Sequence, residues 1–264
     1  MSGMLVLGIE SASDQCGCAL ANDDGVVAET RLALPRRHAE ALAPQMRFVC
    51  EQAGVALGDI DAVAVDHGPG LYTGLRAGLA TAKAAAAALG IGVVAVNSLE
   101  ALAFGSAPPL ESGEVVISVL DARRGEVFWA AYQVCASDLE DVIHGRKPKH
   151  TGRGKDPFEN GFNTRLLCLL LPRVDTLRGM GDLIFDPDGL EMYTAGRLLF
   201  VGNGAISSDE TRPDGLRYPS PAAVALLGRE KALAGAAVAP DAVEPLYLRL
   251  PDAQVPNQPG SAAP

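Results

Sequence analysis

The sequence predicts an α/β protein with two lobes, in which mixed sheets are opened by antiparallel strands. Three observations lead to this class. The chain begins with three consecutive strand-like runs, helices and apolar strands then alternate over residues 36–104, and a strand–hairpin opening returns at residue 114. A start of antiparallel strands differs from the strand–helix–strand opening of dinucleotide-binding folds, so the sequence argues against that class.

The first lobe is predicted from the runs MLVLGIESA, CGCALA and VVAETRLAL, which read as strands, with NDDG at residues 22–25 as a hairpin turn. The first helix follows, because five apolar residues recur on one helical face, and Pro44 either bends this helix or marks its first turn. These five residues are Ala39, Leu42, Met46, Val49 and Ala53. The later elements are a strand at 62–65, a helix at 73–89, a strand at 92–96 and a helix at 98–104.

The second lobe begins with strands at 114–121 and 126–134 around the turn ARRG. A strand with a glycine turn is predicted at 198–205. A helix is predicted at 220–235, with Ser220 as N-cap and Pro221 in the first position. Residues 137–195 show no periodicity beyond the apolar run LLCLLL.

Two lobes that each begin with a strand and a hairpin are typical of the actin-like (ASKHA), ribonuclease-H-like architecture. We expect an N-terminal lobe at 1–107 and a smaller C-terminal lobe at 108–250, whose last helix can pack back on the first lobe. A mobile tail is expected at 251–264, because this segment is rich in proline, alanine and glutamine.

The composition predicts a folded cytoplasmic protein. Hydrophobic residues make up 48% and charged residues 20% of the chain, which suits a packed core. The longest apolar run, around 84–96, is too short and too interrupted by glycine to span a membrane. The five cysteines include no CxxC pair, and an odd count favours reduced thiols.

The net charge of −10 argues against a protein whose main task is to bind a phosphate backbone, because such binding needs a positive surface. One segment differs, since HGRKPKHTGRGK at 144–155 carries five Lys/Arg residues and no acid. A solvated loop is the favoured interpretation, and an RNA-contacting patch is the alternative.

The block GPGLYTGLR, Gly68 to Arg76, lies between a predicted strand and a predicted helix. One interpretation is an anion loop at the helix N-terminus, formed by Gly68, Pro69, Gly70, Thr73 and Gly74. The block matches neither a Walker loop nor GxGxxG, so a tight strand-to-helix turn is the alternative.

The helix after this block carries small residues at steps of four and three: Gly74, Gly78, Thr81, Ala85 and Ala88. Such a stripe lets another backbone approach closely. The neighbour can be a partner molecule or another part of this chain, and the sequence favours neither.

No set of residues predicts a metal site or a nucleophile. Cys16 and Cys18 share one face of a strand, but no second pair lies nearby, and no GxSxG elbow is present. His38 and His67 are isolated in the sequence. We therefore predict no metal ligands and no catalytic residues.

Carboxylates near strand ends leave a second function open. Actin-like phosphotransferases keep catalytic acids at such positions, here Glu10, Asp14, Asp66, Glu100 and Asp121. A stand-alone ATPase or phosphotransferase with Glu10, Asp14 and Asp121 at its phosphates is the alternative, and a peptidase ranks last.

Several blocks together resemble the TsaB (YeaZ) family. They are GPGLYTGLRAGLATAKAAA, VNSLEALA, VLDARRGEVFWAAY, VGNGA and PLYLR. The resemblance covers residues 4–134 and, more loosely, 198–250, and the GPGxxTGLR block is its most specific part. The usual serine-phenylalanine after GPG is Leu71-Tyr72 here. Residues 137–195 match no pattern of the family.

The resemblance implies a non-catalytic subunit that pairs with TsaD, the enzyme making the threonylcarbamoyl modification of adenosine 37 in tRNA. It also implies that a TsaE-like ATPase joins the pair, that tRNA is contacted indirectly, and that the chain forms a homodimer when alone. The isolated chain is expected to bind no cofactor, with ATP or ADP at the junction with the partner. The implied interface residues are His38, Leu42, Met46, Val49, Gly74, Gly78, Thr81 and Ala85.

Two features of TsaD are missing from this chain. The resemblance matches the two metal-binding histidines of TsaD to Ser98 and Leu102, which cannot replace imidazole ligands. It also matches a Ser-Gly-Gly-His-Thr loop of TsaD to Asp121–Gly125, where side chains crowd the backbone and a carboxylate opposes anions. The fold is therefore expected to remain without its chemistry.

Overall fold

The computed structural model describes residues 3–33, 37–106, 114–134, 166–185, 198–204 and 217–249. The basic segment 144–155 and the tail 251–264 lie outside the described residues. Among the described helices, none combines the length and the apolar character needed to cross a bilayer.

The N-terminal sheet has five strands in the order β3-β2-β1-β4-β5. Strands β1 to β3 are antiparallel, and β4 and β5 add in parallel to β1. This confirms the predicted opening and the mixed sheet. The bounds are β1 Val6–Glu10, β2 Cys16–Asn22, β3 Gly25–Leu32, β4 Ala62–Gly68 and β5 Gly92–Asn97.

The second sheet has the order β8-β7-β6-β9, with β6, β7 and β8 antiparallel and β9 parallel to β6. Its strands correspond in order to β3-β2-β1-β4, so the opening is repeated. The bounds are β6 Val115–Arg123, β7 Glu126–Val134, β8 Leu166–Thr176 and β9 Leu198–Val201.

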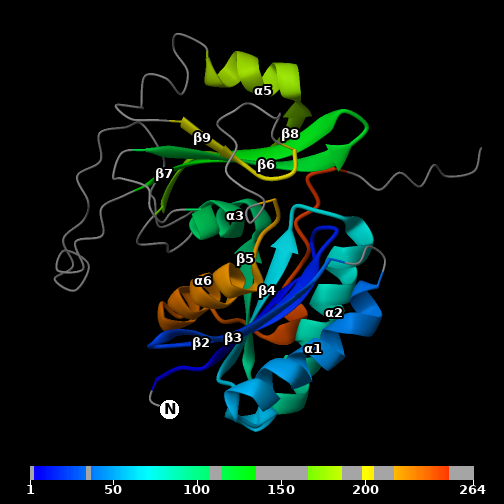
Figure 1. Ribbon diagram of the computed structural model, residues 1–264, viewed down its shortest axis with the longest axis vertical. Helices are drawn as coiled ribbons and strands as arrows, with labels where there is room; N and C mark the ends of the chain where they lie inside the picture. The colour runs from blue at the N-terminus through cyan, green and yellow to red at the C-terminus, as the bar shows by residue number, and fades with distance from the viewer. Residues whose placement is uncertain are drawn as a thin grey trace, which may run out of the picture.

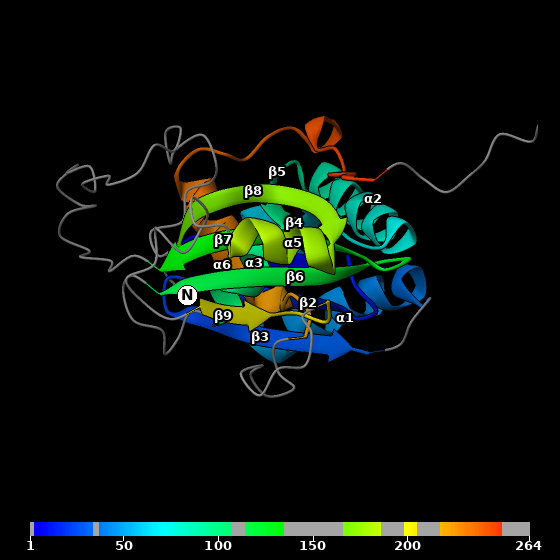
Figure 2. The same ribbon diagram turned by 90° about the horizontal axis from the view of Figure 1, so that it is seen from above.

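Helices and sheets alternate as five layers (Figure 1). Helices α1 and α2 cover the outer face of the first sheet, α6 and α3 lie between the sheets, and α5 covers the outer face of the second sheet. In Figure 2, which is seen from above, α5 lies in front of strands β6 and β7 of the second sheet. The bounds are α1 His38–Ala53, α2 Tyr72–Leu89, α3 Ser98–Ser106, α5 Leu177–Ile184 and α6 Pro221–Leu233, with short 3₁₀ turns at Leu57–Asp59 and Pro240–Ala242.

Helix α6 begins as the sequence predicts. Ser220 is the N-cap, its hydroxyl accepts a hydrogen bond from the backbone N–H of Ala223 at 2.9 Å, and Pro221 follows. Pro44 lies inside α1, which continues through it to Ala53. The helix therefore does not begin at this proline.

The middle layer joins the two lobes. One apolar cluster contains residues of β4 and β5, of α3 and α6, and of β6 and β7. Within it, Lys231 Nζ of α6 donates to Glu100 Oε2 of α3 at 2.6 Å, and both side chains are nearly buried. Burying one member of such a pair without the other is costly, so this contact fixes the two helices relative to each other.

Helix α6 reaches the first sheet closely because Gly8 in β1 has no side chain. A Cβ at Gly8 would lie 2.5–2.7 Å from the backbone nitrogen and Cβ of Ala225 and the carbonyl oxygen of Pro221. Only glycine accommodates this distance.

We predict that Gly8→Ala lowers the free energy of unfolding by about 1–3 kcal/mol, because the added methyl group pushes α6 off the sheet. Chemical denaturation measures this change. Gly58→Ala is the matched control, since a Cβ at Gly58 meets no atom within 4 Å. Equal stability of the Gly8 and Gly58 variants would contradict the packing.

Candidate functional site: the cleft between the lobes

The cleft between the lobes is lined by the loop after β1, the start of α2, the end of β6 and the turn after β9. Its lining residues are Ala12, Ser13, Asp14, Gly70, Leu71, Leu120, Asp121, Arg123 and Asn203. The free space in it is about 10 Å³. Ligand pockets of drug-sized molecules measure about 300–1,000 Å³, so the free space among the described residues of this cleft is far smaller than such a pocket.

The glycines of the GPGLYTGLR block contact the backbone of this chain. A Cβ at Gly70 would overlap the carbonyl oxygen of Ala12, and the backbone N–H of Leu71 donates to that oxygen at 2.7 Å. A Cβ at Gly74 would overlap the carbonyl oxygen of Ser11, and one at Gly78 would overlap the Ser11 hydroxyl. Carbonyl oxygens are acceptors and repel phosphate, so these contacts favour a packing role for the block over the anion loop.

Most of the predicted interface residues are packed inside this chain. His38, Leu42, Met46 and Val49 are buried in α1, and Gly74 and Gly78 are buried in α2. His38 Nε2 lies 3.0 Å from the carbonyl oxygen of Ser13. These six residues therefore cannot form a partner surface themselves, because the first lobe already covers them.

Thr81 and Ala85 remain half-buried, and the Thr81 hydroxyl donates to the carbonyl oxygen of Ala77 at 2.8 Å. The face of α1 that solvent reaches contains instead Ala43, Pro44, Arg47 and Phe48. The Phe48 side chain is 48% exposed. The apolar periodicity of α1 identifies the face that packs on the core. The exposed face is on the opposite side of the helix.

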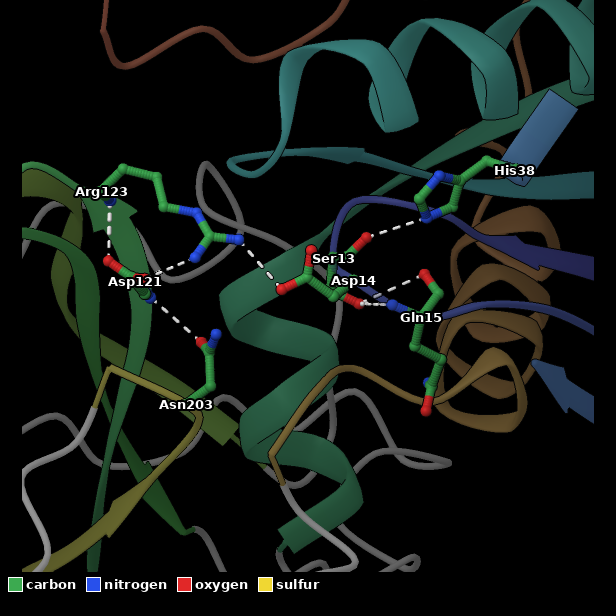
Figure 3. A network of polar contacts seen from close by, with 7 residues as sticks. All are labelled: Ser13, Asp14, Gln15, His38, Asp121, Arg123 and Asn203. Atoms are coloured by element: carbon green, nitrogen blue, oxygen red, sulfur yellow. Dashed lines mark hydrogen bonds and ion pairs between the residues drawn. The ribbon is translucent and has the colours of Figure 1, made fainter. Parts of the chain in front are cut away.

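A polar network joins the lobes across the cleft (Figure 3). Arg123 Nη2 lies 2.9 Å from Asp14 Oδ2, and Arg123 Nη1 lies 3.2 Å from Asp121 Oδ2. Asn203 Oδ1 accepts from the backbone N–H of Asp121 at 3.0 Å. Two of the acids considered for phosphate chemistry, Asp14 and Asp121, are thus engaged with an arginine.

The third of these acids, Glu10, forms a buried pair with Asp66. Glu10 ends β1, Asp66 lies two residues before the end of the neighbouring parallel strand β4, and neither is exposed to solvent. Burial and the nearby Asp66 carboxylate raise the pKa of Glu10 well above its usual range. Burial raises the pKa of Asp66 to about 7. Among the described residues, Glu10 Oε2 and Asp66 Oδ2 find no hydrogen-bond partner.

The residues matched to the TsaD histidines are part of the core. Ser98 is buried and donates its hydroxyl to Asp66 Oδ1 at 2.5 Å. Leu102 is 1% exposed and lies in the apolar cluster between the sheets. Neither position opens to the cleft, whose lining includes no residue of α3.

The sequence did not reveal the contribution of the C-terminal segment. Tyr247 stacks on Tyr72 with ring centroids 5.1 Å apart, and Arg76 lies over the Tyr72 ring at 4.1 Å. Arg249 Nη1 donates to the carbonyl oxygen of Ala122 at 3.0 Å and pairs with Glu126. The PLYLR motif could have indicated this contribution, because its aromatic residue and its arginine can form ring contacts and ion pairs.

Comparisons with known proteins agree with this architecture. The family model described as "TsaD: tRNA N6-adenosine threonylcarbamoyltransferase" matches residues 21–150. The tRNA threonylcarbamoyladenosine biosynthesis protein TsaB of Bacillus subtilis is 29% identical over 95% of this chain and 96% of its own length. The Escherichia coli protein of the same name is 35% identical over 54% of this chain, and the match spans 60% of its length.

A solved structure from Pseudomonas aeruginosa, titled an uncharacterized protein with similarity to peptidase YeaZ, has a TM-score of 0.71. It is 24% identical and covers 93% of this chain and all of its own. The YeaZ structure of Pseudomonas aeruginosa has a TM-score of 0.70 at 22% identity. At these identities the likeness concerns the fold.

The repeated sheets, the helices between them and the cleft define a two-lobed, actin-like (ASKHA) protein of the ribonuclease-H-like type. Within this class, the relatives of the chain are the TsaB (YeaZ) proteins, one of them along 95% of the chain.

The buried acid pair predicts how stability depends on pH. A carboxyl whose pKa is raised by folding stabilises the native state when protonated, and this contribution is lost as the pH rises through the folded value. For Asp66 the window runs from about 4, the unfolded value, to about 7. We predict that Asp66→Asn flattens the fall of stability across this window and raises stability at pH 8 by a few kcal/mol, at about 1.4 kcal/mol per unit of pKa.

Denaturation at a series of pH values measures this effect. Asp66→Ala serves as the control, because it removes both the charge and the hydrogen bonds from Ser98 and Gly68. It should flatten the profile while lowering stability at acidic pH. An unchanged profile in Asp66→Asn would show that this carboxyl is ionised in the folded protein across the whole window.

Proposed function

We propose that this protein is a non-catalytic subunit that activates a TsaD-type transferase in the formation of N6-threonylcarbamoyladenosine at position 37 of tRNA. Similarity to proteins named for this biosynthesis supports a role in it. The cleft gives the main support for a non-catalytic role. Its free space is about 10 Å³, and an arginine that pairs with Asp14 lies between the lobes. A TsaE-type ATPase joins the complex, and tRNA is contacted mainly through the partners.

The partner surface lies on the solvent side of α1 and α2. On α1 the exposed residues include Pro44, Arg47 and Phe48, and on α2 they include Ala80 and Ala84. Alanines on α2 allow a second backbone to approach closely, and Phe48 supplies the large apolar side chain that interfaces bury. The same surface serves a homodimer when the chain is alone.

A nucleotide, in this account, binds at the junction with the partner and not in the isolated chain. The carbonyl oxygens of Ser11 and Ala12 face the glycine block, and Asp14 and Asp121 flank the only guanidinium among the residues that line the cleft. These groups give a phosphate chain no free donor set. The same arrangement counts against the stand-alone ATPase.

Reconstitution tests the function directly. We predict that a TsaD-type partner, with its ATPase and the threonylcarbamoyl donor, modifies tRNA only when this chain is present, because the chain completes the complex. Quantifying the modified nucleoside by mass spectrometry measures the product. Full modification by the partner without this chain would refute the role.

The position of the interface is tested by Phe48→Glu. A glutamate there places an unpaired charge in a buried interface, and we predict at least a tenfold weaker association with the TsaD-type partner, about 1.4 kcal/mol or more. Leu183→Glu on α5 is the matched control, since Leu183 is comparably exposed on the other lobe. Titration calorimetry measures both, and equal affinities for the two variants would place the interface elsewhere.

A further inference from the structure

Arg123 stands where the two lobes meet, between carboxylates that belong to opposite lobes. Its guanidinium extends from the end of β6 and contacts Asp14 of the first lobe at 2.9 Å and Asp121 of its own lobe at 3.2 Å. Figure 3 shows the guanidinium lying between the two acids. A planar group with several donors can bind two carboxylates at once, which a single ammonium does less well.

Both carboxylates are held in place by other contacts. The loop that carries Asp14 is fixed by Glu10 Oε1, which accepts from the backbone N–H of Ala12 at 3.0 Å, and by His38, which contacts the carbonyl oxygen of Ser13. Asp121 donates its backbone N–H to Asn203 and accepts the backbone N–H of Arg123 at 2.7 Å. The site is therefore preorganised for a cation.

The backbone at Arg123 belongs to the turn between β6 and β7. Its φ is +66°, a left-handed conformation that favours glycine. Strained positions persist where the surrounding contacts compensate for them. Arg124 and Gly125 share the left-handed conformation at φ +59° and +78°, so the turn sets this backbone, and the two ion pairs of Arg123 are contacts that compensate for its cost.

We propose that the cleft is a cation-binding site whose ligand is the chain's own Arg123, and that this internal ligand closes the Asp14 side of the cleft without any external one. The class of molecule that fits the site is a guanidinium cation. The proposal concerns the isolated chain and does not depend on its partners.

The contacts on the other side of the same turn define how the cleft opens. Arg249 binds the carbonyl oxygen of Ala122 and pairs with Glu126, which ties the turn to the C-terminal segment. Loss of Arg123 therefore releases the Asp14 side, while the Arg249 side stays closed. Opening is expected at residues 11–15 and not at 243–249.

Arg123→Gly tests the proposal, because it removes the guanidinium and also relieves the left-handed strain. We expect hydrogen exchange of the amides at 11–15 to accelerate about fivefold, the effect of losing an ion pair near a surface. Exchange at 243–249 and the melting temperature should stay close to wild type. Arg31→Ala is the control, since Arg31 pairs with Glu29 within β3 and joins no lobes.

Asp14→Asn removes the same bridge from the opposite lobe with little change of shape, and it keeps the test open if Arg123→Gly folds poorly. The double variant should exchange little faster than either single variant, because both substitutions remove the same ion pair. Millimolar methylguanidinium should restore slow exchange in Arg123→Gly but leave Asp14→Asn unchanged. Wild-type exchange at 11–15 in both single variants, or no rescue by methylguanidinium, would overturn the proposal.

Discussion

The close approach of α2 to the loop after β1 is the constraint on which the rest of the structure depends. Three glycines, Gly70, Gly74 and Gly78, let the backbone of Ser11 and Ala12 lie directly against the helix. The Ser11 hydroxyl also donates to the carbonyl oxygen of Gly74 at 2.9 Å. A single Cβ at any of these positions would overlap an atom of the loop, so the helix and the loop fix each other.

The position of this loop determines the chemistry of the cleft. It aligns Asp14 with Arg123, presents Ser13 to His38 and turns its carbonyl oxygens toward the glycine block. In an enzyme of this architecture, such a block would leave backbone N–H groups free for phosphate. Here Leu71 donates to Ala12, and the glycines are used for packing. The glycine block is thus engaged by backbone and side-chain atoms of the loop after β1.

Much of the fold follows from the sequence, because local patterns specify it. The meander of β1 to β3, the cap of α6 and the repeated hairpin at β6 and β7 all have short-range signals, and the structure confirms them. Strand β8 and helix α5 were missed. The run LLCLLL was recognised as apolar, but it gives neither a period of two nor a period of 3.6, so it did not indicate a strand. The repeat of the first lobe would have predicted a third antiparallel strand there.

The site was less predictable, since it depends on contacts between residues distant in sequence. The resemblance implies a partner surface that includes His38, Leu42, Met46 and Val49, although these residues face the core. Periodicity shows which residues share a face, but not whether a sheet or a partner covers it. The link between Asp14 and Arg123 spans 109 positions, and no local pattern predicts it.

The account's central claim is that the glycine block packs against this chain and leaves no phosphate site in the isolated protein. Titration calorimetry of the purified chain with ATP and magnesium tests it most directly. The account predicts no saturable heat at millimolar nucleotide. Stoichiometric binding at micromolar nucleotide, abolished when Gly70 is replaced by alanine in a chain that still folds, would contradict it.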